Sequence, residues 1–110
     1  MSKSWVEVLK SKPVRRLKNL LTIGNLWLYI LSLIRSKGKV YAYALDEQIE
    51  EEFFFRPGKP MIYLVLYKLE SEKLIKSEYE ERRKYYAITN KGEEALETAK
   101  DYFSVLSKKL

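Results

Sequence analysis

The side chains in this sequence that could take part in chemistry are almost all cations, carboxylates and phenols. Histidine and cysteine are both absent. Their absence removes the usual general base near neutral pH, every thiolate nucleophile or metal ligand, and any disulfide. The 15 acidic residues form no pair in a recognisable catalytic context. The sequence therefore predicts neither an enzyme nor a metal site, and we expect no cofactor.

Charge is unevenly distributed along the 110 residues, whose net charge is +6. Residues 1–45 are strongly basic, residues 46–81 are acidic, and residues 82–110 are basic again. A basic surface attracts polyanions because phosphates that bind Lys and Arg release condensed counterions. The pattern is compatible with a nucleic-acid partner, and equally with the ordinary solvation of a small soluble protein.

Cations and tyrosines occur together in three places, and each has two interpretations. Arg82, Arg83 and Lys84 form a cationic run that either contacts a phosphate backbone or minor groove, or is solvated and partly neutralised by nearby glutamates. The second place is the predicted helix 60–72, where Tyr63 and Tyr67 could face base edges and phosphates or pad the core. The third lies at the junction of the first two predicted helices, where a helix N-terminus could receive a phosphate or the lysines could simply be solvated at a helix end. The candidate DNA-binding residues of the second place are Lys59, Tyr63, Tyr67 and Lys68, and those of the third are Lys39 and Tyr41.

The elements that must position these residues follow from apolar periodicity. Residues 22–36, 41–53 and 60–72 carry apolar residues at helical spacing, and Gly38 and the Pro57–Pro60 loop separate them. Residues 74–79 and 83–88 alternate as two strands with a charged tip between them, which predicts a hairpin. Thr89 or Asn90 then caps a final helix.

The order helix, helix, helix, hairpin, long helix is the layout of a winged helix-turn-helix. We therefore expect a mainly α fold with one β-hairpin (α+β) and three parts. Residues 1–21 form a basic N-terminal arm of unknown role, residues 22–89 the DNA-binding domain, and residues 90–110 a C-terminal dimerisation helix. Pro13 suits a helix start within the arm.

Three segments of the chain resemble the PadR family of transcriptional regulators. The run Arg83–Gly92, RKYYAITNKG, resembles the family's R-K-Y-Y-x-[IL]-T-x-x-G wing pattern, and Tyr63–Glu70 resembles its Y-x-x-L-x-x-L-E helix. Gly38 with Tyr43 and Leu45 is a weaker match to G-x-x-H-G-Y-x-[IL], since Tyr41 and Ala42 replace the His-Gly pair. The resemblance implies a sequence-selective regulator of double-stranded DNA that acts as a repressor. It also implies that the residue at Tyr63 lies on the DNA face.

The final helix carries an apolar stripe with gaps of three and four residues, the rhythm of a coiled-coil seam. A chain of this length has little left to cover such a stripe, so we expect a homodimer. The alternative is packing of the stripe on the first predicted helix of the same chain. Trp27 could join that interface and contact a small aromatic effector, as in some members of the resembled family, or could simply pack in the core. The predicted dimer residues are Leu96, Ala99, Phe103, Leu106, Leu110 and Trp27.

Two further expectations concern location and an alternative function. The start of the chain lacks a continuous apolar signal segment, and the apolar run 26–34 is too short to span a bilayer, so we expect a cytoplasmic protein without a membrane partner. The acidic face of residues 41–53 and the mixed-charge hairpin would also suit a winged helix that binds another protein within a larger complex rather than DNA.

Overall fold

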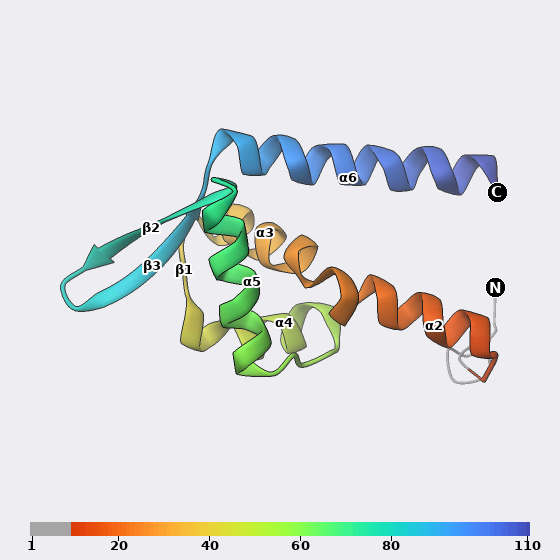
Figure 1. Cartoon of the computed structure of the whole chain (residues 1–110), viewed down its shortest axis with the longest axis horizontal. Coiled ribbons are helices and arrows are strands. Elements are labelled where there is room, and N and C mark those ends of the chain that lie inside the picture. The colour runs from red at the N-terminus through yellow and green to blue at the C-terminus, as the bar shows by residue number, and fades with distance from the viewer. Residues whose placement is uncertain (1–9) are drawn as a thin grey trace.

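The computed structural model describes residues 10–110. The predicted arm therefore lies partly outside the described residues, since residues 1–9 are not included. Helices α2, α3, α4, α5 and α6 and a small sheet make up the described fold (Figure 1). Their bounds, in chain order, are α2 Lys12–Leu21, α3 Leu26–Lys37, β1 Val40–Tyr41, α4 Leu45–Phe53, α5 Lys59–Ser71, β2 Ile75–Glu80, β3 Arg83–Ile88 and α6 Asn90–Lys109.

Helix α3 is the centre of the core. Five of its side chains are buried, and it packs against α4, α5, α6 and β3. Its apolar residues surround most of the helix axis, as expected for a helix with neighbours on several sides. Gly38 ends it with a φ of 85°, a left-handed conformation that glycine adopts without strain. The core is thus built around the helix that precedes the helix-turn-helix pair α4 and α5.

The sheet has three antiparallel strands in the order β1-β3-β2, so the predicted hairpin is correct but incomplete. β1 consists of two residues, and Val40 pairs with Tyr86 while Tyr41 pairs with Tyr85. The prediction of a helix from residue 41 was therefore wrong at its start: Tyr41 lies in a strand, a 3-10 turn follows, and α4 begins at Leu45. Two residues are too few for the alternation by which a strand is detected in sequence.

Helix α3 also begins later than predicted, whereas α2 begins at Lys12, where Pro13 suits a helix start. Residues 22–25 are not α-helical, because a 3-10 turn at Ile23–Asn25 separates α2 from α3. The side-chain amide of Asn25 donates to the carbonyl of Leu20 at 2.6 Å, which holds the two helices together at this break. The whole run Lys12–Lys37 is long and apolar enough, by length and composition alone, to cross a membrane. Its second half, however, is the core helix α3.

The wing projects from one end of the molecule, while α2 and α6 both extend toward the opposite end (Figure 1). The hairpin pairs Glu80 with Arg83, which leaves a two-residue turn at Glu81 and Arg82. Glu81 has a φ of 60°, as the first central position of a tight hairpin turn requires. This arrangement separates the candidate DNA-contacting elements from the two extended helices.

Thr89 and Gly92 join the hairpin to α6. The Thr89 side chain accepts a hydrogen bond from the Gly92 amide at 3.1 Å and caps the helix, which decides between the two predicted caps in favour of Thr89. The same hydroxyl donates to the carbonyl of Lys73 at 2.7 Å, at the turn before β2. Gly92 is buried and packs directly on Leu74. The end of the wing and the start of α6 are therefore one rigid junction.

Candidate nucleic-acid interface

The outer face of α5 carries exposed tyrosines. The helix starts with Gly58 at its cap and Pro60 in its first turn, where a proline costs no hydrogen bond. Ile62, Leu66 and Leu69 face the core, so Tyr63 and Tyr67, four residues apart, point outward. Tyr63 is 50% exposed and Tyr67 is 73% exposed. Neither tyrosine pads the core, and both hydroxyls are positioned to meet a ligand that approaches this face.

Lys59 stands at the start of the same helix, but its ammonium is already bound. Its Nζ lies 3.0 Å from Oδ2 of Asp46 on α4 and donates to the carbonyl of Tyr43 at 3.1 Å. Arg56 contacts the same carboxylate oxygen at 3.0 Å. The hydrogen bond from Lys59, helped by the Glu47 amide and by the charge of Arg56, lowers the pKa of Asp46 below its usual value. Asp46 and Arg56 were not predicted as site residues.

The wing presents its cationic run to solvent. Arg82, Arg83 and Lys84 are all exposed, and the Nζ of Lys84 lies 5.5 Å from the centre of the Tyr86 ring. The glutamates of the wing pair elsewhere: Lys39 contacts Glu80, and the Tyr85 hydroxyl donates to Glu78 at 2.8 Å. The hydrogen bond to Glu78 raises the pKa of Tyr85. Within residues 10–110, the wing glutamates form ion pairs with Lys39 and Lys76 and none with the cationic run at the tip.

Lys39 and Tyr41 lie at the base of the wing in an aromatic group that includes two residues outside the predicted site, Tyr43 and Tyr85. Tyr41 stacks on Tyr43 with a centroid separation of 5.8 Å, and Lys39 lies 5.0 Å from the centre of the Tyr85 ring. Lys39 and Tyr43 are exposed, whereas Tyr41 is half-buried. Strand β1 brings this group beside the hairpin, so the base of the wing is rich in phenols.

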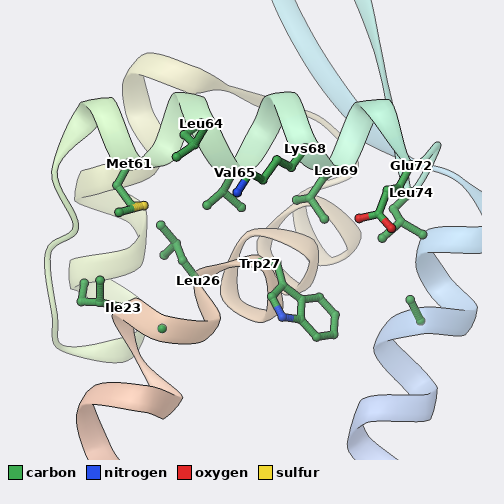
Figure 2. Close-up of a pocket in the computed structure, with 12 residues that line it drawn as sticks. Ile23, Leu26, Trp27, Met61, Leu64, Val65, Lys68, Leu69, Glu72 and Leu74 are labelled. Carbon is green, nitrogen blue, oxygen red and sulfur yellow. The ribbon is translucent and has the colours of Figure 1, made fainter.

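Lys68 lies on a different face of α5 from Tyr63 and Tyr67. It lines a groove of about 670 Å³ between α5, the start of α3 and the start of α6. Figure 2 shows its side chain above this groove, with Trp27 opposite. Trp27 is half-buried and its indole NH donates to Asn25 at 3.2 Å. Lys68 therefore flanks the two tyrosines from the groove side of α5. The remaining groove residues are mostly apolar and include Ile23, Leu26, Met61, Leu64 and Val65.

The predicted stripe of α6 changes character along the helix. Leu96 is buried against the core and Ala99 is half-buried, whereas Phe103 and Leu106 are each 40% exposed and Leu110 is 96% exposed. Phe103 also lines a shallow groove between α6 and α3. The first half of the stripe is thus packed within the chain, whereas the second half remains partly or fully exposed among residues 10–110.

Three helices, a short first strand and a hairpin with basic tip define a winged-helix DNA-binding protein. A family model described as the transcriptional regulator PadR-like family matches residues 30–98. The chain belongs to this family, so it is a DNA-binding transcription regulator, and the resemblance inferred from the wing pattern is confirmed. The members of the family are transcriptional regulators and not enzymes.

Solved structures agree with this assignment. A PadR family transcription regulator from Clostridium difficile is 33% identical, with a TM-score of 0.68 over 74% of this chain and 90% of that one. A PadR-like regulator from Bacillus cereus is also 33% identical, with a TM-score of 0.70 over 84% and 91%. F93 from STIV, a winged-helix DNA-binding protein, shares 20% identity and a TM-score of 0.65 over 70% and 85%, which shows the common fold. A search of curated proteins finds no match.

Proposed function

We propose that the chain is a homodimeric repressor that reads a pseudo-palindromic duplex, with α5 in the major groove and the wing on the backbone or in the minor groove. The observation that carries this proposal is the outward direction of Tyr63 and Tyr67 on the helix that follows the turn of the helix-turn-helix. In this fold the N-terminal part of that helix meets base edges. Tyrosine can donate its hydroxyl to phosphate and pack on sugar or a thymine methyl.

The other predicted contacts divide by role. Arg82, Arg83 and Lys84 are free to neutralise phosphates, which fix register without reading sequence. Lys39 and Tyr41 extend the surface at the base of the wing. Lys59 and Lys68 lie at the edges of the proposed interface. Lys59 is held there in an ion pair with Asp46, and Lys68 lies on the groove side of α5.

The uncovered half of the α6 stripe supports the dimer. Phe103, Leu106 and Leu110 expose apolar surface at the end of a helix of 20 residues that extends beyond the core. A two-fold pairing of such helices would cover this surface and set two copies of α5 about 34 Å apart, one turn of DNA. In this division of labour residues 22–89 bind DNA and residues 90–110 dimerise.

The groove beside Trp27 is the proposed site for a small aromatic effector. Its lining is mostly apolar, with Lys68 and Glu72 at one edge, as is typical of pockets for flat organic ligands. We also place the protein in the cytoplasm, where its DNA target lies. The alternative of a protein-binding winged helix has less support, since the cations at the tip of the wing are exposed.

A fluorescence anisotropy assay tests the proposal on a duplex selected from a random pool. Tyr63→Ala should weaken binding to the selected duplex at least tenfold and leave binding to a random duplex nearly unchanged. Arg83→Ala should weaken both equally and reduce the slope of log K against log salt by about 0.9, the value of one phosphate contact. Lys108→Ala, which removes an exposed cation from the far end of α6, is the matched control. Failure of the unmodified chain to bind any duplex at low salt would refute the proposal.

A further inference from the structure

Asp46 is the one buried charged residue of the described core. It is 4% exposed, although it lies in the first turn of α4, where its neighbour Glu47 is exposed. Its Oδ1 accepts the Glu47 amide at 2.9 Å, and its Oδ2 lies 3.0 Å from both Arg56 and Lys59. A buried carboxylate requires such partners, because an unpaired charge in this position would be strongly unfavourable. Asp46 therefore fixes two cations in place.

Those two cations flank the turn that leads into the helix proposed to read DNA. Arg56 precedes Pro57 and Gly58, and Lys59 is the first residue of α5. Arg56 also donates to Glu50 at 3.0 Å. Two cations and two carboxylates thus form a cluster with no net charge at the end of α5 that would enter the major groove.

The cations are nevertheless close to solvent. The side chains of Arg56 and Lys59 are 44% and 53% exposed, whereas that of Asp46 is 5% exposed. A long lysine side chain released from its partner could rotate about its own bonds and reach a phosphate. Lys59 is held by its ion pair with Asp46 and by its hydrogen bond to the Tyr43 carbonyl, and of these two partners only Asp46 carries a charge.

We propose that Asp46 is a positioning residue that keeps Lys59 away from DNA phosphates and so favours selective over non-selective binding. The proposal rests on the proposed function, since it concerns the same face of α5. Phosphate contacts bind every sequence, and they make affinity depend on salt. An ion pair that withholds one such contact lowers the affinity for random DNA, while Tyr63 and Tyr67 keep their geometry.

The charge-removing, nearly isosteric substitution Asp46→Asn gives the first test. The asparagine oxygen can still accept the Glu47 amide, but it no longer balances Lys59. The log–log salt slope for a random duplex should become steeper by about 0.9. Between 200 mM and 50 mM salt, affinity should accordingly rise about 3.5-fold more than that of the unmodified chain. The ratio of selected to random affinity should fall.

Glu47→Gln is the matched control, because it removes the same charge one residue away from a side chain with no ion-pair partner among residues 10–110. It should leave the slope unchanged. In a Lys59→Met background the effect of Asp46→Asn should vanish, since Glu50 still holds Arg56. An equal slope for Asp46→Asn and the unmodified chain, or an equal effect of Glu47→Gln, would overturn the proposal.

Lys59→Met alone decides the question if Asp46→Asn does not fold. It should weaken binding to the selected duplex, because the turn before α5 loses a tie to α4, but it should leave the salt slope unchanged. A slope reduced by about 0.9 would show that Lys59 already contacts phosphate and would overturn the proposal. If the unmodified chain binds the selected duplex but the variants give the contrary slopes, this inference alone is refuted. If the unmodified chain binds no duplex, the proposed function is refuted as well.

Discussion

Replacing Gly92 by alanine tests the junction between the wing and α6. A Cβ atom at this position would lie 2.0 Å from the carbonyl oxygen of Leu74, 2.8 Å from Cγ1 of Ile88 and 3.0 Å from the Leu74 carbonyl carbon. Two of these atoms belong to backbone, which cannot move aside like the end of a flexible side chain. We therefore expect Gly92→Ala to push α6 away from the turn before β2.

The magnitude follows from three effects. Alanine is intrinsically better than glycine within a helix by about 1 kcal/mol. Overpacking against a rigid neighbour costs about 1–3 kcal/mol, and a contact of 2.0 Å is at the upper end of that range. The same Leu74 carbonyl accepts the Thr89 amide at 3.1 Å and the Thr89 hydroxyl at 3.0 Å, and each weakened bond costs about 1 kcal/mol. The net loss should be about 4 kcal/mol.

Thermal unfolding followed by circular dichroism measures this loss, at one fixed protein concentration because a dimer's stability depends on concentration. A loss of about 4 kcal/mol corresponds to a Tm lower by about 15–30 °C. Gly24→Ala is the control, since its Cβ would meet the nearest atom, the carbonyl oxygen of Asn19, at an ordinary 3.5 Å. If Gly92→Ala melted within a few degrees of Gly24→Ala, the reasoning about the junction would be wrong.

Three other substitutions test the remaining contacts. Thr89→Ala should cost about 2 kcal/mol in urea unfolding, because it removes both a helix cap and the bond to Lys73; a loss below about 0.5 kcal/mol would contradict the assigned cap. Phe103→Lys should shift the chain from dimer to monomer in analytical ultracentrifugation, and a variant that stays dimeric at micromolar concentration would exclude the α6 interface. Asp46 contributes stability that is present above about pH 4 and is lost as the pH falls through its lowered pKa. As the pH falls from about 5 to about 2, through the ordinary pKa range of aspartate, Asp46→Asn should therefore lose less stability than the unmodified chain. Parallel acid-unfolding curves would contradict the ion-pair assignment.

Periodicity was enough to predict most of the fold. The spacing of Ile62, Leu66 and Leu69 correctly placed α5, since these three residues are its buried face. The alternation of the hairpin strands was also correct. The beginnings of α3 and α4 were not, because the 3-10 turn contains Ile23 and the two-residue strand contains Tyr41, which fit the helical pattern without belonging to a helix. Local pattern does not reveal where backbone hydrogen bonds change partner.

The candidate site was less accessible to sequence reasoning. The exposure of Tyr63 and Tyr67 follows from the helical position of their neighbours, so their outward direction could be predicted. The partner of Lys59 could not, because Asp46 lies 13 positions earlier in the chain and only the packing of α4 against α5 brings the two together. A signal was present in the sequence: Asp46 stands beside Leu45 and three residues before Ile49, on the buried side of α4.

The wing pattern by which the family is detected combines two different jobs. Arg83 and Lys84 are exposed at the tip, where they can meet phosphate, whereas Thr89 and Gly92 build the junction with Leu74. Because this junction fixes the start of α6 against the wing, it would also fix the angle at which a dimer helix leaves each DNA-binding domain. Any spacing of two α5 helices on a duplex would then depend on Gly92, a residue far from the bases. The uncharged residues of the pattern, Thr89 and Gly92, are therefore the ones expected to set the spacing between the two halves of the DNA target.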